Sequence, residues 1–114
     1  MNIAAVLFGL AAVGGLTMAT IVLRGAPRPP TWMALGHGAI GAAGLVTLIL
    51  AAIDPGIPRL AQVALGMFVL AALGGLTLFG LFHLKGRPLP IPFVLGHGLL
   101  AASAFGLLLF AVFG

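Results

Sequence analysis

Two histidines are the residues of this sequence best suited to chemistry. Each lies in a Leu-Gly-His-Gly segment, His37 within residues 35–38 and His97 within residues 95–98. An imidazole nitrogen can ligate a metal ion or exchange a proton near neutral pH. The apolar stretches around the histidines contain no Asp, Glu, Lys, Arg, Cys or Tyr. The two histidines are therefore the main candidates to act together.

Composition excludes a water-soluble domain. Of the 114 residues, 62% are hydrophobic and 5% are charged, and the mean hydropathy is +1.33. Soluble domains carry about 25% charged residues, so these side chains cannot form a polar shell. The absence of cysteine excludes disulfides and thiolate metal sites. Five basic residues against one acid, Asp54, are too few for a nucleic-acid surface, and we interpret them as determinants of membrane topology.

Four apolar stretches are long enough to cross a bilayer, which requires ~20 residues. They are approximately Ile3–Leu23, Thr31–Ile53, Leu60–Leu84 and Ile91–Phe113. Proline-rich breaks separate them, and proline stops helices because it lacks an amide donor. A backbone in lipid must satisfy its own hydrogen bonds, so the stretches must be helical. The sequence therefore predicts one all-α transmembrane domain, residues 1–114, built as a four-helix bundle.

The basic residues predict the orientation of this bundle. The first and third breaks contain Arg24, Arg28, Lys85 and Arg87, whereas the second contains one arginine beside the only acid. The positive-inside rule places the first and third breaks in the cytoplasm and both termini outside it. We expect an integral protein of a bacterial inner membrane. The first span is expected to be retained, because it lacks the basic flank and the cleavage site of a signal peptide.

The sequence is also internally repeated. Residues 1–54 align without a gap with residues 61–114, and seventeen pairs are identical. One cluster of identities pairs 11–17 with 71–77, and another pairs the two Leu-Gly-His-Gly segments. Each unit contains two spans, so both copies cross the membrane in the same sense. The predicted architecture is two tandem parallel repeats of a helix hairpin, related by a pseudo-two-fold axis along the membrane normal.

This repeat predicts that the two histidines lie at one depth, six residues or about 9 Å into their spans. Two imidazoles are too few for a bare zinc or copper site. A haem iron needs only two axial ligands from the protein, because the porphyrin supplies four nitrogens. We therefore predict that His37 and His97 ligate a haem iron between the second and fourth spans.

Glycines and basic residues complete the predicted haem site. Glycines beside the histidines would let a flat macrocycle approach, and those at 14 and 74 would do the same or allow close helix packing. Basic residues of the first and third breaks would pair with the propionates. The further site residues are Gly14, Gly36, Gly38, Gly74, Gly96, Gly98, Arg24, Arg28, Lys85 and Arg87.

The bundle layout and the two Gly-His-Gly segments resemble the small four-helix b-type cytochromes, in which histidines from different helices clamp haem b. The resemblance implies an electron carrier or an oxidoreductase subunit, rather than a stand-alone enzyme, that exchanges electrons with quinol or a larger redox complex. Most such proteins bind two haems through four histidines, whereas the single matched pair here implies one haem.

Other interpretations of the histidines stay open. They could be polar contacts in a structural or assembly subunit of a larger membrane complex. They could each ligate a chlorophyll-type magnesium, or the bundle could bind a quinone. Homo-oligomers are compatible with every one of these functions. His83, which aligns with Leu23 of the first repeat, is expected to face lipid headgroups; contact with a propionate or quinone, or a helix cap, is the alternative.

Overall fold

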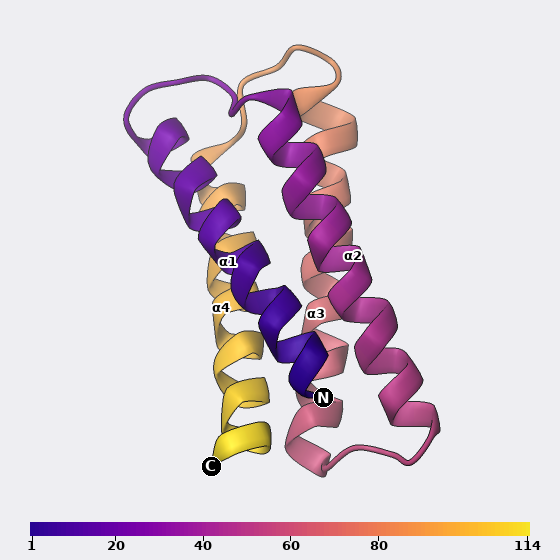
Figure 1. The fold of residues 1–114 in the computed structure, drawn as a ribbon. Helices are drawn as coiled ribbons and strands as arrows, with labels where there is room; N and C mark the ends of the chain where they lie inside the picture. Colours follow the sequence, from indigo (N-terminus) through magenta and orange to yellow (C-terminus); the bar gives the residue numbers. More distant parts are fainter.

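The computed structural model describes residues 1–114 as an all-helical protein (Figure 1). Four helices are long and apolar enough to cross a membrane. They are α1 (Asn2–Leu23), α2 (Thr31–Ile53), α3 (Arg59–Thr77) with its π-helical continuation η1 (Leu78–His83), and α4 (Ile91–Phe113). The predicted all-α class and the four candidate spans are confirmed.

The breaks between the helices contain the residues expected to stop them. Pro30, Pro58 and Pro90 immediately precede α2, α3 and α4. Gly25 after α1 and Gly86 after η1 have φ values of 112° and 68°. Such left-handed conformations are accessible to glycine without strain and let the chain leave a helix abruptly.

The helices form a bundle with two distinct ends (Figure 1). One end, here called the basic end, is formed by the loops 24–30 and 84–90, and the main chains of these loops are joined by the bond from the Leu89 N–H to the Pro27 carbonyl oxygen (2.9 Å). The other, here called the terminal end, holds both chain termini and the loop between α2 and α3. Each of α1 and α3 packs along both α2 and α4. The pairs α1–α3 and α2–α4 are therefore the two diagonals of the bundle.

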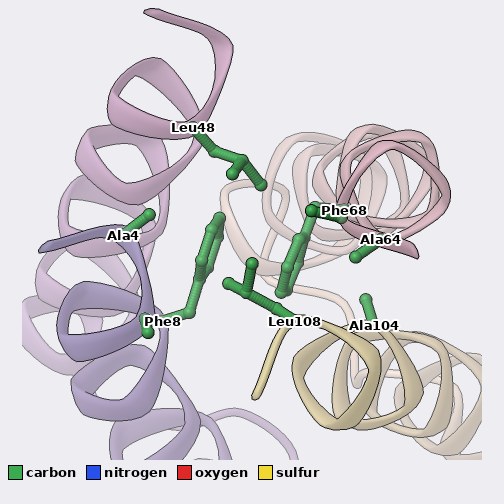
Figure 2. Packing of buried hydrophobic residues seen from close by; sticks show 9 residues of the cluster. Ala4, Phe8, Leu48, Ala64, Phe68, Ala104 and Leu108 are labelled. Atoms are coloured by element: carbon green, nitrogen blue, oxygen red, sulfur yellow. The ribbon is translucent and has the colours of Figure 1, made fainter. Parts of the chain in front are cut away.

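The closely packed core lies at the terminal end. Phe8 of α1 and Phe68 of α3 stack face to face, with ring centroids 3.7 Å apart and planes 2° apart (Figure 2). Leu48 and Leu108, on α2 and α4, are the largest side chains that are completely buried, and they extend toward this stack. Small residues complete the cluster, namely Ala4, Ala5, Ala61, Ala64 and Ala104.

The third span differs from the predicted continuous α-helix over Leu60–Leu84. Its α-helix ends at Thr77, and the main-chain bonds then span five residues, as in the bond from the Leu84 N–H to the Phe79 carbonyl oxygen (2.9 Å). A π-helical turn holds more residues than an α-helical turn, so it changes the direction of the side chains that follow. The apolar pattern contains no sign of this change, because the residues involved are as hydrophobic as their neighbours.

Candidate functional site

His37 and His97 meet across the α2–α4 diagonal, in the half of the bundle toward the basic end. Their ring centroids are 6.2 Å apart and their planes are inclined at 81°. Both side chains are half-buried. The two histidines that the sequence analysis singled out are therefore brought together, although their helices are not neighbours in the bundle.

Each imidazole is oriented by a main-chain carbonyl of the preceding helix. The His37 Nδ1–H donates to the Ala11 carbonyl oxygen at 2.7 Å, and the His97 Nδ1–H donates to the Ala71 carbonyl oxygen at 2.8 Å. A carbonyl oxygen can only accept, so Nδ1 carries the hydrogen, and Nε2 of the neutral ring keeps its lone pair. Metal-ligating histidines are commonly held in this way, with one ring nitrogen bonded to a carbonyl and the other available to the metal.

Glycine pairs on α1 and α3 make room for these rings. A Cβ atom at Gly15 would lie 3.0 Å from His37 Cε1, and one at Gly75 would lie 3.1 Å from His97 Cε1. The predicted site glycines at 14 and 74 lie against the same rings at ordinary contact distance. In this structure the glycine pairs therefore make room for the imidazole rings, whereas the sequence analysis assigned the room to a macrocycle or to close helix packing. The sequence repeat contains both pairs, but only the structure identifies Gly15 and Gly75 as the closer residue of each.

The glycines that flank the histidines in sequence have a different environment. A Cβ atom added to any of them would meet no atom within 4 Å. The helix surface on either side of each histidine therefore carries no side chain. Packing within the chain does not require glycine at these positions. These residues are Gly36, Gly38, Gly96 and Gly98.

The surroundings of the rings are less tightly filled than the terminal end. No completely buried large side chain lies beside the histidines, since both such residues belong to the core cluster. Neither Nε2 atom has a hydrogen-bond partner in the chain. Every completely buried polar side-chain atom does have a partner, so both Nε2 atoms must retain some accessible surface. The cavities described below lie at the basic end and not between the rings. A macrocycle would therefore enter only if the helices moved apart.

The donor set fits an axially ligated haem better than a bare metal ion. No third histidine, cysteine, aspartate or glutamate lies close enough to the pair to complete a metal site. An ion held by protein side chains alone would therefore lack the ligands that zinc or copper sites usually have. Two neutral imidazoles are sufficient where a porphyrin supplies the remaining nitrogens.

The four predicted propionate partners lie in the loops of the basic end, away from the imidazoles. Arg28 is half-buried, with its guanidinium against the main chain of Gly86, whereas Arg24, Lys85 and Arg87 are exposed. No acidic residue occurs at this end of the chain. The structure thus places these residues in one electropositive region but does not bring them into contact with the histidines.

His83 is buried between η1 and α2 rather than exposed at the end of its helix, so the expectation of an exposed interfacial position is wrong. Its side chain is 8% exposed, and its Nε2 lies 2.9 Å from Thr31 Oγ1 at the start of α2. Its ring also stacks on that of Phe79. Leu23, at the aligned position of the first repeat, is 52% exposed. The difference arises because His83 ends the π-helical segment η1, whereas α1 remains α-helical through Leu23.

Replacing Gly15 by alanine is expected to displace the His37 ring and lower stability by about 1–2 kcal/mol, as overpacking of a close contact does. The new methyl group would lie 3.0 Å from Cε1, so the ring must move and the bond to Ala11 must lengthen. NMR shifts of the His37 ring in the cofactor-free protein, together with thermal unfolding, measure both effects. Gly36→Ala is the control, because its methyl group would meet nothing. Equal effects of the two variants would contradict the proposed close contact.

Comparison of the chain with protein-family models, curated proteins and solved structures finds no significant match. The function must therefore be argued from the geometry of the site. That geometry consists of two imidazoles with bonded Nδ1 atoms and free Nε2 atoms, in the interior of a four-helix bundle.

Proposed function

We propose that this protein is a membrane electron carrier that binds one haem b between α2 and α4, with His37 and His97 as axial ligands. The observation that carries the proposal is the paired orientation of the imidazoles. Both rings donate Nδ1–H to a carbonyl, both keep Nε2 free, and their centroids are 6.2 Å apart. The edge-to-face contact between the two rings does not depend on the hydrogen bonds to Ala11 and Ala71, so these bonds are a separate feature that supports the proposal.

The separation of the rings suits a shared ion. An imidazole nitrogen ligates a first-row metal ion at about 2 Å, so two rings on opposite sides of one ion have centroids about 6 Å apart. The inclination of 81° between the planes is compatible with axial ligation, because each ring can rotate about its own metal–nitrogen bond. The centroid separation therefore matches that of two imidazoles on one ion, although a macrocycle needs the bundle to open around the pair.

We further infer that the bundle is a doubled hairpin with a pseudo-two-fold axis along the membrane normal. Phe8 contacts its own counterpart Phe68, and His37 contacts its own counterpart His97. Side chains that contact their symmetry mates lie at the axis. The equivalent bonds to Ala11 and Ala71 support the same relation. The segment η1 has no counterpart in the first repeat and limits this symmetry to the rest of the chain.

The distribution of charge supports a membrane orientation with the basic end in the cytoplasm. Four of the five basic residues lie in the loops of that end, whereas Arg59 and Asp54 lie at the other. The positive-inside rule then leaves both termini outside the cytoplasm. We propose the inner membrane of a bacterium as the location, with the lipid bilayer as the immediate environment of all four helices.

The residues of the chain would perform three tasks in this function. The two Nε2 atoms would hold the iron, the carbonyls of Ala11 and Ala71 would fix the rings, and the apolar helices would exclude water. With both axial positions filled by imidazole, a bound haem supplies one-electron redox chemistry without an open site for oxygen. A quinone or a larger redox complex is the proposed partner, so the chain is a carrier or oxidoreductase subunit rather than a complete enzyme.

An absorption spectrum of the detergent-purified protein tests the proposal directly. We expect a Soret band, and sharp bands on reduction that are typical of low-spin haem b, with one haem per chain by pyridine haemochrome assay. Long-wavelength bands would instead indicate a chlorophyll-type pigment. A protein that is colourless after expression with sufficient haem, and that does not take up added haem, would contradict the proposal and favour a structural or assembly subunit.

A further inference from the structure

A cavity of about 620 Å³ opens at the basic end, between the end of α1, the loop that follows it, the start of α2 and the end of η1. The polar side chains of its lining are Arg28, Thr31 and His83, and its walls include Ile21 and Leu84. This cavity is distinct from the space between the paired histidines, since neither His37 nor His97 lines it.

The groups around the cavity favour an anion. The half-buried Arg28 supplies five N–H donors in a planar fork, which matches the oxygens of a phosphate. The cavity also adjoins the start of α2, where the N–H groups of Thr31 and Trp32 have no main-chain partner. The only acid of the chain, Asp54, lies at the opposite end of the bundle. No carboxylate of the protein therefore competes for these donors.

His83 supplies the second, independent indication of a ligand. It is more than nine-tenths buried, yet its Nδ1 has no hydrogen-bond partner in the chain. No completely buried polar atom is left without a partner, so Nδ1 has some accessible surface, and the residue lines the cavity. In the tautomer in which the Thr31 hydroxyl donates to Nε2, Nδ1 carries a hydrogen that can be donated to a ligand oxygen.

A shallower groove adjoins this cavity along α1. It has a volume of about 340 Å³, is lined by residues of α1 between Leu16 and Arg24, and shares Ile21 with the cavity. Its lining combines the apolar Leu16 and Ile21 with polar residues of α1, and it leads from the basic end toward the middle of the membrane span. The hydroxyls of Thr17 and Thr20 donate to carbonyls of α1 itself and so make no demand on a ligand. A ligand with a charged head and an apolar tail matches the cavity and the groove together.

We propose that the cavity binds the phosphate of an acidic phospholipid, with Arg28 and His83 as donors to the phosphate and one acyl chain along the groove of α1. Basic pockets between transmembrane helices are known to bind anionic headgroups. The proposal does not rest on haem ligation by the paired histidines, because neither of them lines the cavity, although Arg28 is also one of the predicted propionate partners. It also explains why the second repeat departs from the first: η1 brings a histidine to a place where the first repeat has an exposed leucine.

Titration of the detergent-solubilised protein with short-chain phosphatidylglycerol tests this site, with binding followed by tryptophan fluorescence or by native mass spectrometry. Trp32 lies next to the cavity residue Thr31 and is the only tryptophan of the chain. We expect saturable binding of one lipid per chain, and binding at least tenfold weaker for the Arg28→Gln variant. Arg87→Gln is the matched control, because it removes the same charge from the same end without altering either cavity, and it should bind within about twofold of the unmodified chain.

Four outcomes would overturn the proposal. Equal weakening by Arg28→Gln and Arg87→Gln would indicate a diffuse electrostatic effect. Equal binding of phosphatidylcholine would show that the negative charge is not recognised. Equal affinity for inorganic phosphate or glycerol 3-phosphate would indicate a free-phosphate site without a role for the groove. Loss of lipid binding in the His37→Ala/His97→Ala variant, with its helical content intact, would show that the cavity depends on the paired histidines. Retained binding supports a separate lipid site.

Discussion

Replacement of either His37 or His97 by alanine is expected to abolish the low-spin haem b spectrum of the purified protein. In the proposed site each imidazole would supply one of only two axial ligands, and no other cysteine, histidine or carboxylate lies near enough to replace it. Loss of one ligand leaves an open or exchangeable iron position, and loss of both leaves nothing in the chain to hold the iron. Reduced-minus-oxidised difference spectra at matched protein concentration measure the effect.

The Leu99→Ala variant serves as the control for this experiment. Leu99 lies on the same helix as His97, two residues further along, but its side chain is 69% exposed and points away from the bundle interior. Its spectrum should match that of the unmodified protein. Sharp b-type bands in both histidine variants would refute axial ligation by this pair and would leave the haem proposal without its site.

Replacement of Phe68 by alanine is expected to destabilise the bundle by about 3 kcal/mol or more, the range for large-to-small changes in a packed core. The ring stacks on Phe8 at 3.7 Å and is 6% exposed, so its removal opens a cavity between α1 and α3. Dispersion contacts matter here, because packing supplies most of the association energy of helices in a membrane. Reversible unfolding in mixed micelles of increasing denaturing-detergent fraction measures the change.

Phe110→Ala provides the matched comparison, since the Phe110 ring is 64% exposed on α4. This variant should lose less than about 1 kcal/mol, the range of substitutions away from packed features. Similar losses for the two phenylalanines would show that the stack does not hold the bundle together and that stability is spread over all the helix surfaces.

The helices and the meeting of the histidines were predictable because both follow from patterns that the sequence repeats. Proline-rich breaks determine where the spans begin, and α2 and α4 begin and end at the predicted residues. The proposed repeat places His37 and His97 at one depth. Their contact then depends on which faces of α2 and α4 turn inward.

The partners of the histidines were not predictable, because they are main-chain atoms. Every residue has a carbonyl, so no residue type marks Ala11 or Ala71 as an acceptor. The π-helical segment η1 was missed for a related reason. Its residues are as apolar as their neighbours, and the contact of His83 with Thr31 that accompanies it joins residues 52 positions apart, so the local sequence does not reveal it.

The position of the core at the terminal end has a consequence for how the protein would mature. The Phe8–Phe68 stack holds α1 against α3 at the terminal end, and the buried Leu48 and Leu108 pack beside it. The opposite extremity has no such cluster and is held in part by polar contacts, among them the Leu89–Pro27 bond and the contact of Thr31 with His83. Entry of the proposed haem would therefore separate the helices in the basic half of the bundle, while the Phe8–Phe68 stack keeps α1 and α3 together at the other end.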